Sequence, residues 1–216
     1  NEIVCGKTTS TVESSVASFG GSSYANTAYC KNTTTIAGSN SGNGKVEITL
    51  MESYPEVSLS ASKINTNKDV VITANAKDEV IGLTSAPYSW NGEERVESKT
   101  YIATKNGTYT VDVINNYGRT ETASIEINNI DKIKPVVESI TQSVSSDKRT
   151  SILTLIARDD ASSDYIATGI AGYAITTSET LPTEFQSSNT FTVKQNGTYY
   201  GWVKDAVGNA SELVAN

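Results

Sequence analysis

The most constraining feature of the sequence is a short motif that occurs twice, 90 residues apart. Asn-Gly-Thr-Tyr stands at 106–109 and again at 196–199, and each copy leads into a strand-like stretch. A second glycine turn follows at the same distance, at Gly118 in the first copy and Gly208 in the second. Because an Asn-Gly turn beside an alternating stretch is typical of β-structure, we expect a repeated β-domain of about 90 residues.

Alternation of apolar and polar residues extends through both repeats. Val70, Ile72 and Ala74 share one face of a predicted strand, and the stretch 151–157 takes the same place in the second repeat. No stretch shows sustained helical periodicity. The sequence therefore predicts an all-β chain with two tandem immunoglobulin-like β-sandwiches and an N-terminal glycine-rich β segment.

Composition divides the chain into three parts. Glycine and serine dominate the first part, where Val46, Ile48 and Leu50 alternate with polar residues and favour a β segment over a flexible linker. Pro55 marks the next boundary, and the polar junction before Pro135 separates the two repeats. The predicted parts are a glycine-rich β segment at 1–53, one sandwich at 54–131 and another at 132–216.

Charge and composition limit the classes of function. The 17 Lys and Arg against 24 Asp and Glu give a net charge of -7, which repels phosphate and argues against nucleic acid as a partner. There is no histidine, so the commonest general base and zinc ligand are missing. No apolar run approaches the roughly 20 residues that span a bilayer, so we expect no membrane insertion in this fragment.

The two cysteines, Cys5 and Cys30, lie in the glycine-rich part. In an oxidising compartment they can form one disulfide, whose loop would stabilise the fold by roughly 3–4 kcal/mol on the chain-entropy model. Two unpaired thiols are the alternative, and the sequence leaves both readings open.

Part of the glycine-rich segment resembles a known family. Residues 20–24, 35–38 and 41–44 are similar to the closing portion of the glycine-rich domain of bacterial surface proteins and of the anaplastic lymphoma kinase ectodomain. The resemblance covers about 35 residues, and the long glycine tracts expected upstream are missing.

The repeats resemble a second family. The motif at 196–199, the turn at 203–209 and the stretch 169–173 look like parts of bacterial Ig-like repeats, and residues 55–130 resemble them less closely. The resemblance implies stalk and adhesion modules of extracellular, cell-surface or secreted bacterial proteins, some of which accompany carbohydrate-active enzymes. Asn1 is not a natural start, so we expect the chain to be a piece of a longer surface protein whose neighbouring domains are its partners.

The repeated motif allows two interpretations. As sequons, Asn32, Asn106, Asn196 and Asn209 would accept glycans. As a structural bend, the motif would place Tyr109 and Tyr199 as corner tyrosines whose hydroxyls bond back to the backbone. We favour the structural interpretation.

An acidic cluster follows the second strand of the last repeat. Its members Asp159, Asp160 and Asp164 lie in one loop, and Asp205 lies in a turn at the same end of the predicted sandwich. Carboxylates on adjacent loops could hold calcium, which takes about six to eight oxygen ligands. The alternative is a solvated loop, with Asp205 bonding the backbone of its own turn.

Two aromatic residues, Tyr200 and Trp202, are expected on the outward face of the motif strand, since Tyr199 and Val203 point inward. They could stack on a sugar ring of a host or cell-wall glycan, or pack against a neighbouring protein or the segment 171–188. Trp90 is expected in a core. Lys63, Lys68 or Lys148 with Asn128 or Asn129 would permit an internal isopeptide bond.

These features favour a non-catalytic structural or adhesive module over an enzyme. A glycosidase needs only two carboxylates, but a catalytic unit would not be expected to repeat. The alternative is a carbohydrate-binding accessory module of a secreted enzyme. Neither reading implies a cofactor other than the calcium considered above.

Overall fold

The computed structural model describes residues 2–3, 24–25 and 53–215, and all regular secondary structure in these ranges is β-strand. The chain divides into two compact units, Asn1–Glu52 and Ser53–Asn216. In the first unit, β1 (Glu2–Ile3) pairs in parallel with β2 (Tyr24–Ala25). The remaining predictions for this unit, including Cys5, Cys30 and Asn32, lie outside the described residues. In the described ranges, no helix has the length and apolar character needed to cross a membrane.

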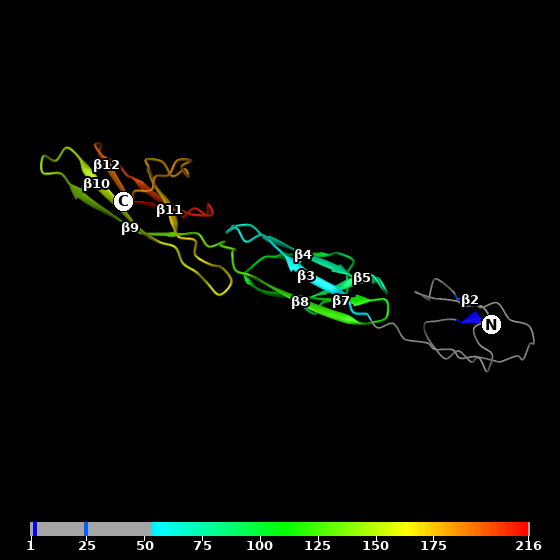
Figure 1. Cartoon of the computed structure of the whole chain (residues 1–216). Helices are drawn as coiled ribbons and strands as arrows, with labels where there is room; N and C mark the ends of the chain where they lie inside the picture. The colour runs from blue at the N-terminus through cyan, green and yellow to red at the C-terminus, as the bar shows by residue number, and fades with distance from the viewer. Residues whose placement is uncertain (1, 4–23, 26–52, 216) are drawn as a thin grey trace, which may run out of the picture. The chain divides into compact units, whose positions relative to one another are not determined.

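The first sandwich contains strands β3 to β8 (Figure 1). One sheet has the strand order β3-β4-β6 and the other β5-β7-β8, and all neighbours are antiparallel. The strands are β3 (Glu56–Ser60), β4 (Val70–Lys77), β5 (Leu83–Trp90), β6 (Thr100–Ala103), β7 (Gly107–Asn115) and β8 (Thr120–Ile127).

The second sandwich contains strands β9 to β14. Its sheets have the orders β9-β10-β12 and β11-β13-β14, again antiparallel throughout. The strands are β9 (Val136–Val144), β10 (Ser151–Arg158), β11 (Ile170–Thr176), β12 (Thr190–Val193), β13 (Tyr200–Asp205) and β14 (Val214–Ala215).

Both sandwiches use one connectivity. The first, second and fourth strands form one sheet, and the third, fifth and sixth form the other. This is the strand division of an immunoglobulin-like sandwich without the edge strand that joins the first sheet in constant-type domains. The predicted all-β fold with two tandem sandwiches is confirmed.

The core of the first sandwich follows the predicted alternation. Along β4, Val70, Ile72 and Ala74 are buried while Val71 points outward. Trp90 is 2% exposed and lies in the same core, as its sequence context predicts. Full burial of a valine or isoleucine side chain contributes roughly 1.5–3 kcal/mol to the stability of the fold.

The core of the second sandwich is smaller. Val137, Leu155 and Val203 form its buried centre. Gly201 allows close sheet packing there, because a Cβ at this position would lie 2.8 Å from Cδ1 of Ile140 and 3.2 Å from Cδ2 of Leu155. Val111 occupies the corresponding place in the first sandwich and is fully buried.

Candidate functional site

The linker between the sandwiches, residues 128–135, is held by hydrogen bonds to the first sandwich. The side-chain amide of Asn106 donates to the Ile130 carbonyl at 2.8 Å, and the Ile130 amide donates back to Asn106 Oδ1 at 2.9 Å. Thr66 adds two backbone bonds of 2.9 Å, donating to the Asn129 carbonyl and accepting from the Asp131 amide. Asn106 of the repeated motif therefore fixes the start of the linker.

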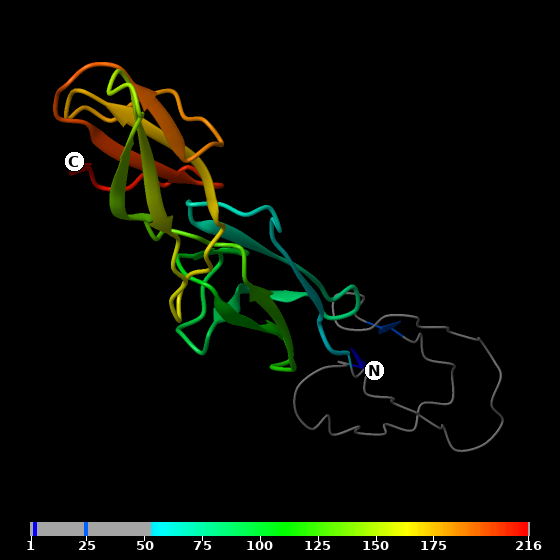
Figure 2. The same cartoon turned by 90° about the vertical axis from the view of Figure 1, so that its left-hand side faces the viewer.

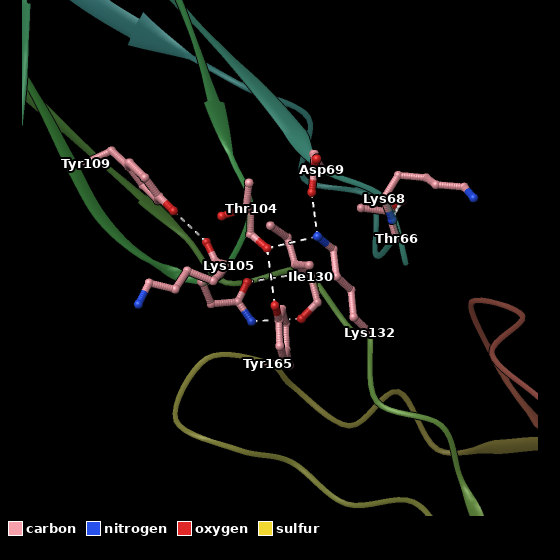
Figure 3. Close-up of polar contacts among 10 residues, drawn as sticks. Thr66, Lys68, Asp69, Thr104, Lys105, Tyr109, Ile130, Lys132 and Tyr165 are labelled. Carbon is pink, nitrogen blue, oxygen red and sulfur yellow. Dashed lines mark hydrogen bonds and ion pairs between the residues drawn. The ribbon is translucent and has the colours of Figure 1, made fainter. Parts of the chain in front are cut away.

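The loop 159–169 of the second sandwich also contacts the first. The Asn106 amide donates to the Asp164 carbonyl at 2.8 Å, and Tyr165 packs against the first core. Figure 2 shows this yellow loop beside the green segments of the first sandwich. Figure 3 shows Lys132 bonded to Asp69 and to the Thr104 carbonyl, which also accepts the Tyr165 hydroxyl. These bonds connect the linker and the loop to one end of the first sandwich.

Three carboxylates meet where the linker contacts the second sandwich. Asp131 comes from the linker, Asp159 follows β10, and Asp205 ends β13. One oxygen of each lies within 4.8 Å of the others. We call this group the acidic cluster. Asp131 and Asp205 are 0% and 1% exposed, and Asp159 is partly buried.

Hydrogen bonds position two members of the acidic cluster. Asp131 Oδ2 accepts from the amide and the hydroxyl of Thr168, at 2.9 and 2.7 Å. Asp205 Oδ1 accepts three successive amides of its own turn, from residues 207–209. The predicted bonding of Asp205 to its turn is therefore present, and it coexists with the cluster.

Asp159 is bonded less completely. Its Oδ2 accepts from the Gly169 amide at 2.7 Å, whereas its buried Oδ1 has no hydrogen-bond partner in the described part of the chain. Burial raises the pKa of the Asp159 carboxyl, and the charges of Asp131 and Asp205 add to this against the opposing backbone hydrogen bonds. Two ionised carboxylates at such distances repel by roughly 3–4 kcal/mol at an effective dielectric constant of about 20.

The same place in the first sandwich is occupied by Ser53, Asp78 and Asn115, which we call the amide cluster. Asn115 lies 90 residues before Asp205, and Asp78 follows β4 as Asp159 follows β10. The fully buried Asn115 donates its side-chain amide to Asp78 Oδ2 and to the Ser53 carbonyl, both at 2.8 Å. Its Oδ1 accepts the amides of Tyr117 and Arg119, as Asp205 does in its own turn.

Asp78 is well supplied with hydrogen-bond donors. The Ser53 hydroxyl and the amides of residues 80 and 81 donate to its Oδ1. Burial by itself would raise the pKa of Asp78, but these hydrogen bonds and the one from Asn115 lower it below its ordinary value. The two related carboxyls, Asp78 and Asp159, thus shift in opposite directions.

The structure brings together only part of the predicted calcium set. Asp159 and Asp205 meet, but Asp160 forms an ion pair with Arg158. Oδ1 of Asp164 lies 3.6 Å from Nζ of Lys105 in the first sandwich. Asp160 and Asp164 therefore lie outside the group of carboxylates that Asp159 and Asp205 join. The third carboxylate, Asp131, was missed because it lies in the linker, away from the loop and the turn that carry the others. Aligning the two repeats on Pro55 and Pro135 does not indicate it either, because Ser53 then aligns with Ile133.

Of the alternatives for Tyr200 and Trp202, the structure shows packing against the segment 171–188 rather than an exposed pair. Trp202 does lie on the face opposite Val203, yet it is only 5% exposed, and its indole N–H donates to Thr176 Oγ1 at 3.0 Å. The Tyr200 hydroxyl donates to Glu179 at 3.2 Å, and Lys204 lies under the ring of Phe185. The segment 176–186 therefore contacts this face, so Trp202 is not available for a sugar ring.

The corner tyrosines behave as the structural interpretation requires. The Tyr109 hydroxyl donates to the Lys105 carbonyl at 2.8 Å, and the Tyr199 hydroxyl donates to the Gln195 carbonyl at 2.9 Å. Asn106 and Asn209 use their side-chain amides internally, which disfavours both as glycan acceptors in the folded chain. Asn196 is exposed.

The residues proposed for an isopeptide bond do not form a buried site. Lys63, Lys68 and Lys148 are exposed. Asn129 is buried, and its amide donates to the carbonyls of Ser62 and Ile64. An isopeptide bond needs a buried lysine beside the asparagine, so the structure does not support this prediction.

Comparison with known proteins adds little to this geometry. No protein-family model matches the chain, and no curated protein matches it significantly. Among solved structures, the fibronectin(III)-like modules of Clostridium thermocellum CbhA are similar, at 12% identity over 73% of this chain and 91% of that one. The TM-score is 0.30, so the fold assignment rests on the strand pairing described above.

Proposed function

We propose that the chain is a non-catalytic extracellular spacer: two sandwiches in tandem that position neighbouring domains of a bacterial surface or secreted protein. The observation that carries the proposal is that both sandwiches form hydrogen bonds to the linker. Asn106 binds Ile130 on one side, while Asn209 of the second sandwich donates to the Asp131 carbonyl at 3.0 Å. Hydrogen bonds that fix a linker from both sides restrict the relative motion of two domains, which is what a spacer requires.

Burial argues against catalysis at the acidic cluster. A glycosidase needs two carboxylates that a sugar can reach from both sides of its bond. Asp131 and Asp205 are enclosed, so a substrate cannot lie between them. The carbohydrate-binding alternative depended on Tyr200 and Trp202, and the burial of Trp202 argues against it. The extracellular location is the one that the resemblance to bacterial Ig-like repeats implies.

Distances between spin labels in the two sandwiches test the proposal. Labels at exposed Glu121 and Thr192, in a variant with Cys5 and Cys30 replaced by serine, should give a narrow distance distribution. Asn106→Ala should broaden it. The matched control is Asn196→Ala, which alters the same motif at an exposed position of the second sandwich and should leave the distribution narrow. A parent chain as broad as the Asn106→Ala variant would rule out a spacer of fixed geometry.

A further inference from the structure

The acidic cluster holds more negative charge than its place in the fold requires. The amide cluster fills the same place with one carboxylate, Asp78, and Asn115 donates to that carboxylate and to the Ser53 carbonyl. In the second sandwich, Asp205 takes the place of Asn115, and Asp131 adds a third carboxylate. The side-chain amide of Asn209 makes the bridge there, donating to Asp205 Oδ2 at 2.6 Å and to the Asp131 carbonyl at 3.0 Å. An amide neutralises no charge, so three carboxylates stand where the amide cluster has one.

One carboxylate oxygen of the acidic cluster lacks a hydrogen-bond donor among the described residues. Oδ1 of Asp159 is buried and accepts no hydrogen bond from the described residues, whereas Oδ1 of Asp78 accepts three. A buried carboxylate oxygen without a donor is costly, and a bound cation is one of the few partners that can satisfy it. This observation is independent of the number of acidic residues at the site.

The donor set selects the kind of ion. All three side chains offer carboxylate oxygens, which suit hard cations such as calcium or magnesium, and the chain has no histidine to favour zinc. Calcium accepts irregular and bidentate carboxylate geometry, while magnesium demands a near-ideal octahedron. Waters can complete the coordination. We propose that Asp131, Asp159 and Asp205 bind one calcium ion at the junction of the two sandwiches.

The ion would act on the linker and on the loop that contacts the first sandwich. Asp131 belongs to the linker, and Asp159 begins the loop that carries Asp164 and Tyr165. Coordination would join these two segments to the turn after β13, in addition to the hydrogen bonds of Thr168 and Asn209. Calcium would thereby stabilise the junction, a role that goes beyond the proposed spacer function and stands independently of it.

Calorimetric titration of the full chain, first treated with chelator, tests the proposal with calcium chloride as the probe. One calcium ion should bind with a Kd of about 1 mM or tighter, in the range of extracellular calcium modules. At roughly 100-fold excess over Kd, the melting temperature of the second sandwich should rise by at least about 5 °C. Magnesium should bind more weakly, and magnesium binding without calcium binding would overturn the choice of ion.

Two variants separate a metal ligand from a merely structural residue. Asp159→Asn should weaken calcium binding at least about tenfold, yet melt at the same or a higher temperature in chelator because it removes repulsion. Asp205→Asn should fold, since Asn115 holds the same turn in the first sandwich, and should also lose the calcium response. Asp160→Asn is the matched control, because it removes the adjacent charge outside the cluster and should bind calcium like the parent.

Three results would overturn the inference. The first is a folded parent chain that shows neither binding heat nor a melting shift at about 10 mM calcium, well above the weakest affinities of extracellular modules. The second is an equal loss of binding in Asp160→Asn and Asp159→Asn, which would assign the effect to general charge. The third is an unchanged calcium response in both cluster variants. Each of these results can be distinguished from failure of the proposed spacer function, because the spin-label distances test that function without added metal.

Discussion

The two sandwiches have the same strand order but differ where the linker meets the ends of two strands. In the amide cluster, Asn115 both accepts from its own turn and donates to Asp78 and the Ser53 carbonyl. In the acidic cluster, Asp205 accepts the equivalent turn amides, and the side-chain amide of Asn209 donates to Asp205 and to the Asp131 carbonyl. One turn geometry therefore serves two different clusters. The first has a single carboxylate that is well supplied with donors, and the second has three carboxylates, of which Asp159 leaves one oxygen without a donor among the described residues.

The cores differ in a related way. Val111 fills the first core, while Gly201 at the corresponding position lets Ile140 and Leu155 approach the backbone of β13. Each sandwich also has one buried tryptophan, Trp90 or Trp202. Fluorotryptophan NMR can therefore follow the unfolding of the two sandwiches separately, and exchanges between equivalent positions test the comparison directly.

The largest expected effect comes from converting the amide cluster toward the acidic one. Asn115→Asp removes the donor to Asp78 and adds a charge at a position that is 0% exposed. We expect the first sandwich to lose about 3 kcal/mol of unfolding free energy at neutral pH, the usual cost of an uncompensated buried charge. Urea titration read at Trp90 measures it.

Asn75→Asp provides the control for this exchange. It makes the same chemical change at an exposed position of β4, so its effect should stay within about 0.5 kcal/mol. Equal losses in the two variants would show that the amide of Asn115 is unimportant, and the contrast between the clusters would fail.

The second exchange tests the cores. Gly201→Val introduces the residue of the first sandwich into a space where a Cβ would lie 2.8 Å from Ile140. Overpacking of this kind costs about 1–3 kcal/mol, which should appear as earlier unfolding of the second sandwich at Trp202. Adding Ile140→Val should recover part of the loss, because it removes the Cδ1 atom nearest to the new side chain. A fully stable single variant would contradict the packing described here.

Sequence predicted most of the fold because its signals are local. The Asn-Gly turns, the corner tyrosines and the alternation along β4 and β7 depend on neighbouring residues alone, and each lies where it was expected. Trp202 shows the limit of this reasoning. Strand alternation placed it correctly opposite Val203, but it does not reveal that the segment after β11 folds back on this face, where Glu179 contacts Tyr200 and Phe185 contacts Lys204.

The candidate site was predictable only in part for the same reason. Asp159 and Asp205 could be paired because the ends of their strands lie at one end of a sandwich. Asp164 was misplaced because its loop turns to the first sandwich, where Lys105 lies 3.6 Å away. Asp131 was overlooked because the position of a linker is set by packing between domains, which strand periodicity does not describe.

A smaller difference is expected between the two corner tyrosines. Tyr109→Phe removes a hydrogen bond to Lys105 in a buried setting and should cost about 1 kcal/mol. Tyr199→Phe removes the equivalent bond to Gln195 at a more exposed position and should cost about half as much. Urea titrations at the two tryptophan signals give both values. A larger loss for Tyr199→Phe would show that burial does not set the strength of the two bonds.

The smallest expected effect is a pH dependence confined to the amide cluster. The pKa of Asp78 in the folded chain lies below its ordinary value of 3.8, because the hydrogen bonds that it accepts outweigh its burial. The ionised form is thus favoured by folding, so its contribution to stability is complete above pH 3.8 and is lost as the pH falls through the folded-state pKa.

Other carboxyls also titrate in acid, so the informative quantity is the difference in stability between the parent and Asp78→Asn. This difference in the urea midpoint at Trp90 should shrink as the pH falls below 3.8, while the signal of Trp202 should show no difference between the two proteins. A difference that stays constant through this range would mean that Asp78 has the same proton affinity in the folded and unfolded chain, and the hydrogen bonds from Ser53 and Asn115 would then not distinguish its two protonation states.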